Sequence, residues 1–581
     1  MLQSADRMWA LFIFCCLARL AFAGTTSDWK SRSIYQVFTD RFARTDGSTS
    51  AKCDTKKGLL CGGTWRGIIN HLDYIQGMGF DAIMISPVTE NIEGRVEYGE
   101  AYHGYWPQDL YKLNPHFGSR TDLLDLQKQL HDRGMYFMVD VVINNMASMT
   151  NGSDPSTAVD YSILKPFNDR KYFHSYCKIE DYDDYDEAQK CWTGDDIVAL
   201  ADLNTEDDTV TKMMEDWVKG LVSNYSIDGL RIDAAKHVGT DYLAKIANAA
   251  GVFTTGEVYD GDVHNVCGYQ NYIPSVPNYP VYFAMIKAFT AGNTTALSSE
   301  ISFLDEVCED VSALATFSEN HDLPRFPSYT KDLSLAKNVL TFTILSDGIP
   351  LYYQGQEQHF SGSGTPTNRE ALWTSKYSTT SPLYTLTASL NKIRSHAIRL
   401  NADYLSTTSY PLYTDGSTIA VRKGVEGRQV LTIYSTQGVK GGEYMLELPV
   451  SYTPGMQVVE VLGCRNYTVE GVGVLRVQMG KGLPKVFFPA EKMDGSGLCG
   501  FSNATETVGG VVQGGAGGLR TMGVGGVVMT VMGVVVVGVF VEFTISFEGK
   551  ERLSPSTFIN MDGNNESSRS LEEHSSEDGI E

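Results

Sequence analysis

The sequence predicts an α/β fold, a (β/α)8 barrel, and two observations support this prediction. From about residue 30 to residue 400, short apolar runs of strand length alternate with stretches of helical periodicity. Strands that alternate with helices are typical of a parallel sheet covered by helices, and seven or eight such units suit a closed barrel. The runs that we interpret as buried strands are 33–38, 80–86, 135–142, 227–232, 252–258, 313–320 and 348–353.

The clearest helix of this series lies in the stretch 120–135. Thr121 is a suitable cap, apolar residues recur at helical spacing, and Gly134 provides a stop. We therefore expect a helix that opens at the threonine and ends before the glycine.

Two stretches depart from the alternation of strands and helices. The connection from Asn145 to Leu203 is long and rich in Asp, Tyr, Ser and Gly, which indicates either a functional loop or a small inserted domain. After about residue 405 the pattern changes to short alternating runs, which predicts an all-β module that ends near Cys499.

The N-terminus has the composition of a signal peptide. Arg7 precedes an apolar run from Met8 to Phe22, and "AFA" at 21–23 is a small-x-small cleavage pattern. A transmembrane anchor would need a longer apolar run. Residues 1–23 therefore predict secretion to the extracellular space.

The C-terminal part, 501–581, has an unusual composition. A Gly-rich linker leads into an uncharged apolar run at 523–541, and a polar, acidic tail follows. A glycolipid anchor signal, a spanning helix and a misread gene end remain alternative interpretations. The segment indicates attachment to a membrane or cell wall.

The charge balance is acidic. The chain has 70 Asp plus Glu against 47 Lys plus Arg, a net charge of −23. An acidic surface argues against nucleic acid as a partner and suits a neutral ligand.

The cysteines and sequons fit a secreted protein. Of 10 cysteines, Cys15 and Cys16 lie in the signal peptide, which leaves an even number for up to four disulfides. No CxxC pair occurs, which argues against a zinc site. Sequons for N-glycosylation occur at Asn151, Asn224, Asn293, Asn466, Asn503 and Asn565.

Three acidic residues lie at the ends of predicted strands: Asp233, Glu257 and Asp322. The C-terminal ends of barrel strands converge on one face, where active sites lie. Carboxylates grouped there can cleave a glycosidic bond, since one attacks the anomeric carbon, one transfers the proton and another stabilises the oxocarbenium charge. For any one of these acids taken alone, a helix cap or an ion pair is the better explanation.

These acids lie in motifs that resemble the α-amylase family, glycoside hydrolase family 13. "DVVINN", "GLRIDAAKH", "GEVYD" and "FSENHD", in this order and spacing, resemble its four signature regions, and "ALADLN" at 199–204 resembles a fifth. The likeness is to fungal α-amylases and runs from about Trp29 to Cys499. It implies a (β/α)8 barrel (24–144 and 204–405), a domain inserted after the third strand (145–203) and a C-terminal antiparallel β-sandwich (406–500).

The resemblance also implies roles for single residues. Asp233 resembles the nucleophile, Glu257 the general acid/base and Asp322 the transition-state stabiliser. Arg231 would keep Asp233 ionised, because a fixed cation lowers the pKa of a neighbouring carboxyl. His103 could instead be structural, and Trp106 could be plain core. The implied substrate-binding residues are His103, Tyr105, Trp106, Arg231, Lys236, His237, His321 and Arg369, and the implied disulfides are Cys53–Cys61, Cys177–Cys191, Cys267–Cys308 and Cys464–Cys499.

One residue departs from the family pattern in a way that bears on the reaction. The first signature region usually reads Asp-x-x-x-Asn-His, whereas here Asp140 is followed by Asn144 and Asn145. An amide is shorter than imidazole and stays neutral, although it still bonds a sugar hydroxyl. The change resembles a subgroup of cell-surface, glycolipid-anchored fungal 4-α-glucanotransferases. Thr365, where fungal amylases carry an Asp, is a second departure.

From this we predict a retaining, monomeric enzyme that acts on α-1,4-glucan or maltooligosaccharides as a 4-α-glucanotransferase anchored at the fungal cell surface. The alternative is a secreted, calcium-dependent α-amylase that hydrolyses internal bonds of starch-like polysaccharide. An alternative of another class is a non-catalytic glucan-binding surface protein.

The resemblance further implies a calcium ion as cofactor. Its protein ligands would be Asn144, Asp202 and the carbonyl of His237, and Gln189 stands where a Glu is expected. Calcium prefers several oxygens with negative charge among them, so replacing a carboxylate by an amide predicts a weakened site.

Overall fold

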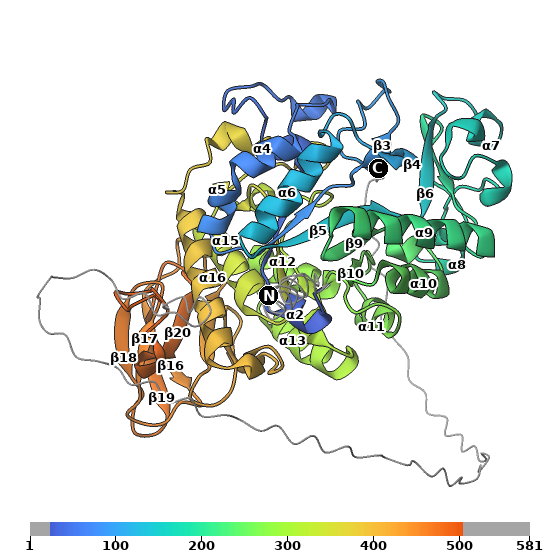
Figure 1. Cartoon of the computed structure of the whole chain (residues 1–581). Helices are drawn as coiled ribbons and strands as arrows, with labels where there is room; N and C mark the ends of the chain where they lie inside the picture. The colour runs from blue at the N-terminus through green and yellow to red at the C-terminus, as the bar shows by residue number, and fades with distance from the viewer. Residues whose placement is uncertain (1–23, 504–581) are drawn as a thin grey trace, which may run out of the picture. The chain divides into compact units, whose positions relative to one another are not determined.

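The computed structural model describes residues 24–503 (Figure 1). The predicted signal peptide, the apolar anchor-like run, the acidic tail and the sequon at Asn565 lie outside these residues. Everything described below belongs to one compact unit of the chain.

A parallel sheet forms the centre of the molecule, as predicted. Its strands follow the spatial order β10-β9-β5-β2-β1-β12-β11, and every pairing is parallel. The bounds are β1 (Ile34–Val37), β2 (Ala82–Ile85), β5 (Tyr136–Val142), β9 (Gly229–Asp233), β10 (Phe253–Gly256), β11 (Ala315–Thr316) and β12 (Ile349–Tyr353).

The segment 275–277 closes this sheet into a barrel. Ser275 forms a parallel β-bridge with Thr255 of β10, and Pro277 forms a parallel β-bridge with Ala315 of β11. The carbonyl oxygen of Ser275 accepts from the Gly256 N–H at 3.0 Å. Sequence analysis did not identify this segment, because it is short and its prolines disguise a strand.

The longer helices follow the barrel strands along the chain and pack around the sheet (Figure 1). Their bounds are α4 (Trp65–Asn70), α5 (Leu72–Gly77), α6 (Arg120–Asp132), α9 (Asp208–Tyr225), α10 (Thr240–Ala250), α12 (Tyr279–Ala291), α13 (Thr295–Val307), α15 (Leu333–Leu345) and α16 (Pro382–Leu400). Shorter helices are α2 (Thr26–Lys30), α3 (Thr39–Phe42), α7 (Pro155–Ala158), α8 (Tyr185–Ala188), α11 (Val263–Gly268) and α14 (Phe326–Tyr329).

Helix α6 is capped two residues earlier than predicted. Ser119, not Thr121, caps it: the Ser119 hydroxyl accepts from the Asp122 N–H at 3.3 Å, and the Asp122 carboxylate accepts from the Ser119 N–H at 2.9 Å. This reciprocal capping box satisfies two free backbone donors, which a threonine inside the first turn cannot do. Gly134 follows the helix with φ +71°, as expected of a stop.

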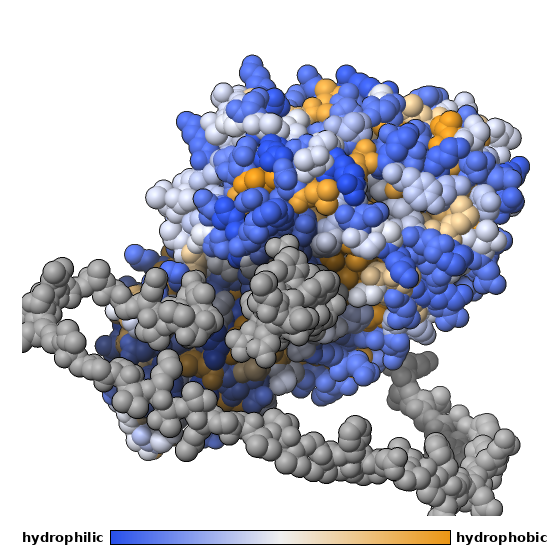
Figure 2. Space-filling view, in the orientation of Figure 1, coloured by the Kyte–Doolittle hydropathy of each residue, from blue (hydrophilic) through white to orange (hydrophobic). Residues whose placement is uncertain are grey.

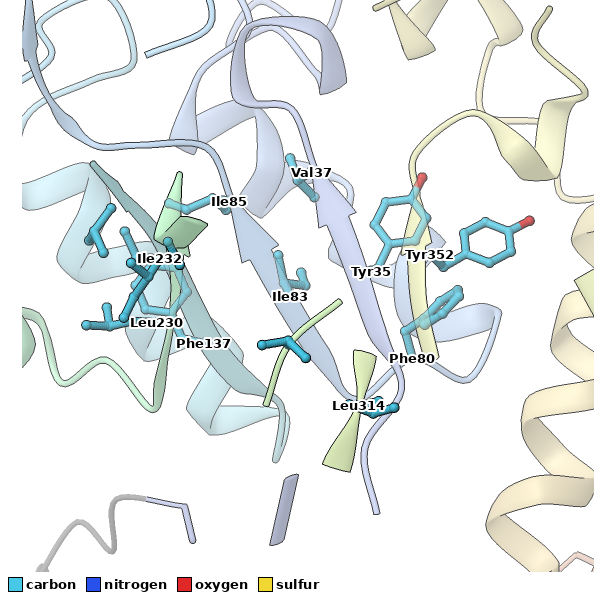
Figure 3. Packing of buried hydrophobic residues seen from close by; sticks show 14 of the residues in the cluster. Tyr35, Val37, Phe80, Ile83, Ile85, Phe137, Leu230, Ile232, Leu314 and Tyr352 are labelled. Atoms are coloured by element: carbon cyan, nitrogen blue, oxygen red, sulfur yellow. The ribbon is translucent and has the colours of Figure 1, made fainter. Parts of the chain in front are cut away.

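Barrel strands bury both of their faces. Ile83 and Ile85 of β2 point outward with Phe137, Leu230 and Ile232 toward the helices (Figure 3). The alternate residues pack inside the barrel, in a separate cluster that includes Ile34, Ala82, Met84, Met138 and Leu351. Burial on both faces explains why these strands read as near-continuous apolar runs in the sequence.

The chain leaves the barrel after β5 and forms a small antiparallel sheet of β6 (Asn145–Met149), β8 (Val198–Asp202) and β7 (Thr193–Gly194). Asn145 pairs with Asp202 in the β6–β8 register. A hairpin of β3 (Thr89–Asn91) and β4 (Pro107–Leu113) follows β2. The insertion therefore begins directly at the C-terminal end of the third barrel strand.

An antiparallel β-domain ends the described chain. A six-stranded sheet in the order β13-β14-β15-β20-β17-β18 shares an apolar core with the two-stranded sheet β16–β19. Asn338 of α15 joins this domain to the barrel through hydrogen bonds to the Ser435 N–H (2.9 Å) and the Gly482 carbonyl oxygen (2.7 Å). The bounds are β13 (Tyr410–Thr414), β14 (Thr418–Lys423), β15 (Val430–Ser435), β16 (Tyr444–Pro449), β17 (Gln457–Glu460), β18 (Arg465–Thr468), β19 (Val474–Met479) and β20 (Lys485–Pro489).

All cysteines between residues 24 and 503 are paired. The disulfides are Cys53–Cys61, Cys177–Cys191, Cys267–Cys308 and Cys464–Cys499. Such bonds persist in oxidising compartments, which indicates an extracellular protein.

The surface of this unit is polar. On the face shown in Figure 2, hydrophilic residues predominate and hydrophobic residues form small, separate patches. Within residues 24–503, none of the helices combines the length and apolar character that crossing a membrane requires.

Candidate active site

The three predicted acids lie at the C-terminal ends of barrel strands. Asp233 is the last residue of β9, Glu257 directly follows β10, and Asp322 lies in the loop after β11. Their side chains are 18%, 15% and 36% exposed, respectively. The strand ends therefore bring three partly accessible carboxyls to one face of the barrel.

Arg231 links these acids from inside the barrel. Its Nη1 donates to Asp233 Oδ1 at 2.5 Å and to both oxygens of Asp140 at 3.1 Å. Its Nη2 lies 2.8 Å from Glu257 Oε2. The two nitrogens of one guanidinium thus hold Asp233 and Glu257 next to each other.

Burial and the charge of Arg231 have opposite effects on the pKa of the carboxyls in this cluster. Burial raises the pKa of Asp233 well above its usual range, and Arg231 acts against this increase. Burial likewise raises the pKa of Asp140 to about 6. Arg231 therefore favours the ionised form of Asp233, and burial opposes it. That Arg231 keeps Asp233 ionised stays a prediction.

Two residues that sequence analysis missed hold Glu257 from its other side. The Tyr279 hydroxyl donates to Glu257 Oε1 at 3.1 Å and accepts from Asn320 Nδ2 at 3.2 Å. Asn320 Oδ1 in turn accepts from the Asp322 N–H at 2.9 Å. The pair thus links the loops that carry Glu257 and Asp322. The only sequence signal was the position of Asn320 inside "FSENHD".

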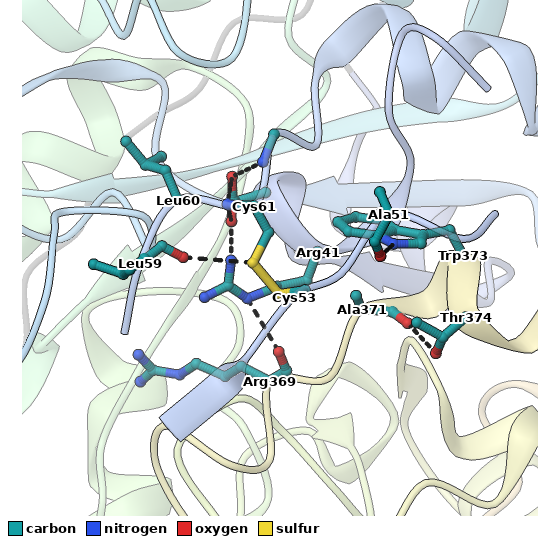
Figure 4. Close-up of a disulfide and its surroundings, with 12 residues drawn as sticks. Arg41, Ala51, Cys53, Leu59, Leu60, Cys61, Arg369, Ala371, Trp373 and Thr374 are labelled. Carbon is teal, nitrogen blue, oxygen red and sulfur yellow. Dashed lines mark hydrogen bonds and ion pairs between the residues drawn. A yellow bond between two sulfur atoms is a disulfide. The ribbon is translucent and has the colours of Figure 1, made fainter. Parts of the chain in front are cut away.

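Arg369 is the partner of Asp322. Its Nη2 donates to Asp322 Oδ1 at 3.0 Å, and its Nε donates to the His321 carbonyl oxygen at 2.9 Å. The Arg369 carbonyl accepts from Arg41 Nε at 3.1 Å, beside the Cys53–Cys61 disulfide (Figure 4). A fully buried arginine and a disulfide loop therefore support the residue that holds Asp322.

Aromatic rings line the same face. The Tyr105 ring lies parallel to the His321 imidazole with centroids 5.1 Å apart, and its hydroxyl donates to Asp140 Oδ2 at 2.7 Å. His103 is buried, and its Nδ1 accepts from the Tyr105 N–H at 3.0 Å. Trp106 packs edge-on against His103 and belongs to a buried apolar cluster with Ala147 and Val198. Tyr105 therefore joins His321 to Asp140, and His103 and Trp106 pack behind it.

Comparisons with known proteins agree with this geometry. The family model described as "Alpha amylase, catalytic domain" matches residues 36–382, and "Alpha-amylase, domain C" matches residues 411–507. The chain belongs to the α-amylase family.

Named relatives of this α-amylase family enzyme include fungal proteins. Alpha-amylase 2 of Schwanniomyces occidentalis is 47% identical over 485 residues, covering 83% of this chain and 95% of that protein. Alpha-amylase 1 of Lipomyces kononenkoae is 51% identical over 479 residues, covering 82% and 76%. The solved structure of an α-amylase from Malbranchea cinnamomea is 48% identical with a TM-score of 0.79, covering 82% of this chain and all of that one.

Asn145, the departure in the first signature region, is buried in this α-amylase family enzyme. It is the first residue of β6, shortly after β5 ends, and the residue is 4% exposed. Its Nδ2 has no hydrogen-bond partner. A buried donor without a partner carries a desolvation cost that a bound hydroxyl would remove.

Lys236 and His237 lie on the side of Glu257 toward the inserted domain. Lys236 Nζ donates to the Tyr259 carbonyl oxygen at 3.3 Å and lies 3.6 Å from Asp183. Two exposed aromatic residues lie here as well: Tyr259, 43% exposed, packs edge-on against Phe283, 37% exposed. Neither aromatic residue was singled out from the sequence.

The predicted calcium ligands come together at the start of the insertion. The Asn144 amide faces the His237 carbonyl oxygen at 2.8 Å and Asp202 Oδ1 at 2.9 Å. With its nitrogen turned toward them it donates two hydrogen bonds, whereas with its oxygen turned toward them three oxygens converge. Gln189 follows Ala188, whose carbonyl oxygen lies 3.0 Å from His237 Nδ1.

The chemistry of this set suits a hard cation only weakly. Asp202 supplies its single carboxylate, and calcium favours oxygen ligands with more negative charge. Across residues 24–503, no three His, Cys, Asp or Glu side chains are grouped to hold a metal ion.

Proposed function

We propose that this enzyme hydrolyses internal α-1,4-glucosidic bonds of starch-like polysaccharide with retention of configuration. The observation that carries the proposal is the single guanidinium of Arg231 in contact with both Asp233 and Glu257. In retaining glycosidases the two catalytic carboxyls are about 5–5.5 Å apart. Two carboxyls that contact the same guanidinium are held close together, which fits this short separation. The α-amylase names of the relatives support the same activity.

The proposed reaction has two steps. Asp233 attacks the anomeric carbon while Glu257 protonates the leaving glycosidic oxygen, which forms a glycosyl ester on Asp233. Glu257 then removes a proton from water, which attacks the same carbon and releases the sugar. Asp322, held by Arg369, lies where its charge stabilises the oxocarbenium-like transition state.

A product analysis tests hydrolysis. The purified protein is incubated with maltoheptaose, and product lengths and new reducing ends are followed together. We expect only shorter sugars, with reducing ends that rise in proportion to bond cleavage. Products longer than the substrate with almost no gain in reducing ends would reject hydrolysis as the main activity.

A 4-α-glucanotransferase, the main prediction from the sequence, is the second candidate. It is supported by Asn145, whose buried Nδ2 replaces the usual histidine contact. Exposed Tyr259 and Phe283 beside Glu257 offer a surface on which an acceptor sugar could stack. The names of the relatives favour hydrolysis, so transfer takes second place.

Asn145→His is expected to shift the balance toward hydrolysis. A histidine restores the usual contact, so kcat/KM for maltoheptaose hydrolysis should rise by about 3- to 10-fold, the value of one hydrogen bond. The ratio of longer products to new reducing ends should fall. Asn151→His, on the exposed surface of the insertion, is the matched control. An unchanged ratio in Asn145→His would show that the amide does not set the outcome.

We also propose that Asn144, Asp202 and the His237 carbonyl hold a calcium ion weakly. A bound ion would tie the inserted domain to the barrel, because these ligands come from both parts. In the proposed reaction, Asp233, Glu257 and Asp322 act without any of these calcium ligands.

Gln189→Glu is expected to tighten calcium binding. An added carboxylate next to this cluster should increase the rise in Tm caused by millimolar calcium, and chelator should then cost more stability. Gln457→Glu adds the same charge at the exposed first residue of β17 and serves as the control. Equal calcium responses in both variants would exclude Gln189 from the site.

The disulfides and the fungal α-amylase relatives support an extracellular location for the protein. Sequons at Asn151, Asn224, Asn293, Asn466 and Asn503 are exposed, as glycan attachment requires. Attachment to a membrane or cell wall and the monomeric state stay predictions.

A further inference from the structure

Gln36 places an amide group in the interior of the barrel. It lies on β1, where Tyr35 and Val37 face the outer helices and Ile34 faces the interior. Because side chains alternate along a strand, Gln36 shares the interior side with Ile34. It is 5% exposed, and its Nε2 lies 2.9 Å from His321 Nδ1.

The other nitrogen of His321 lies close to an acid of the active site. His321 Nε2 lies 3.0 Å from Asp322 Oδ2, and Asp322 Oδ1 accepts from Arg369. Burial lowers the pKa of His321 well below its usual range, with Arg369 acting in the same direction, which favours the neutral ring. A neutral imidazole has one N–H, and the two contacts compete for it.

The contact with Asp322 decides where the hydrogen lies. A lone pair on Nε2 would lie 3.0 Å from a carboxylate oxygen, which is electrostatically unfavourable, whereas an N–H at the same distance is favourable. This contact therefore favours the hydrogen on Nε2, and Nδ1 then accepts one. The donor to Nδ1 is Gln36 Nε2. In this orientation of the amide, Gln36 Oε1 has no hydrogen-bond donor.

We propose that Gln36 is a positioning residue that fixes His321 in the Nε2–H tautomer, so that the ring presents a hydrogen-bond donor to the reacting sugar and to Asp322. The parallel Tyr105 ring holds the plane of the imidazole, and Gln36 sets its rotation and its proton. This inference rests on the proposed function for its effect on catalysis. The tautomer itself is a property of the free protein and is measurable without turnover.

Two substitutions of Gln36 distinguish the effect of its hydrogen-bond donor from the effect of its side-chain shape. Gln36→Glu keeps the side-chain shape but replaces the donor with a carboxyl. Gln36→Met keeps the length and removes the donor. Gln354→Met, directly after the neighbouring strand β12, is the control for losing a buried amide. The Gln354 backbone N–H donates to the Gln36 carbonyl oxygen, and its side chain accepts from the Phe38 N–H.

The expected pH dependence of Gln36→Glu has a definite sign. At acidic pH the introduced carboxyl is protonated, or the ring is cationic, and in both cases Nε2 keeps its hydrogen. As the pH rises, the introduced carboxylate draws the hydrogen to Nδ1, and the donor toward Asp322 is lost. kcat/KM for maltoheptaose should therefore fall at a lower pH than in the unmodified protein. The groups that face the ring and set this midpoint are Asp322, Arg369, Arg231, Glu257 and His103.

Gln36→Met should lower kcat by about 3- to 10-fold with little change in KM, because a transition-state contact weakens. Gln354→Met should lower Tm to a similar extent but keep kcat and the pH profile.

NMR of protein with isotope-labelled histidine, assigned with His321→Gln, reads the tautomer directly. We expect Nε2–H in the unmodified protein and in Gln354→Met, and a pH-dependent change in Gln36→Glu. An Nδ1–H signal in the unmodified protein, or an unaltered pH profile and unaltered His321 signals in Gln36→Glu, would overturn the proposal. Absence of any turnover would instead reject the proposed function and leave the tautomer result intact.

Discussion

Asp233→Asn is expected to reduce the rate of glucan cleavage by about 10⁴-fold or more, because an amide cannot form the glycosyl ester. The Arg231 contact at 2.5 Å needs an oxygen, which asparagine retains, so the fold should persist. The measurement is kcat/KM for maltoheptaose together with Tm.

The matched control is Asp208→Asn, whose side chain is fully exposed at the start of α9. It should keep full activity. Turnover by Asp233→Asn within about tenfold of the control would show that Asp233 is not the nucleophile, since the loss of a required nucleophile is far larger.

Glu257→Gln is expected to lower the cleavage of maltoheptaose by about 10³- to 10⁴-fold, since proton transfer to the leaving oxygen is lost. The loss should be much smaller for a maltosyl fluoride, whose leaving group needs no proton. Measured on both substrates, this pattern distinguishes an acid/base from a nucleophile.

Asp233→Asn is the internal comparison, because it should fail on both substrates alike. An equal loss on the fluoride and on the sugar in Glu257→Gln would contradict the acid/base assignment. Tyr279 and Asn320 should support Glu257 in this role, because their hydrogen bonds reach its other oxygen.

The sequence allowed the barrel, the insertion and the C-terminal β-domain to be predicted, because burial leaves strong periodic patterns. The bridging segment 275–277 was missed, since closure of a barrel depends on partners elsewhere in the chain and not on the segment's own apolar residues. The cap of α6 was placed at Thr121 because both hydroxyl residues precede the same apolar run, and only the Asp122 contact distinguishes them.

The sequence predicted only those residues of the candidate site that lie in family motifs. Motifs identify residues that touch substrate in the family, such as Asp233 and His321. Residues that act through others, such as Tyr279 and Gln36, lie in segments that read as ordinary helix or strand. Their positions follow from packing across the barrel. The contact of Arg369 with Asp322 likewise appears only in three dimensions.

The choice between hydrolysis and transfer depends on a few polar contacts. Asn145 argues for transfer through one unpaired donor, whereas the likeness to named α-amylases extends over most of the chain. A hydrogen bond is worth about 0.5–1.5 kcal/mol, enough to change the ratio of two outcomes but not the bond that is cleaved.

A proton NMR time course of maltoheptaose with the purified protein tests the central claim most directly. Retaining hydrolysis predicts that new α-anomeric reducing ends appear first and rise as internal α-1,4 signals fall. Early β-anomeric ends would contradict retention by Asp233 and Glu257, and internal signals that stay constant while chain lengths redistribute would contradict hydrolysis.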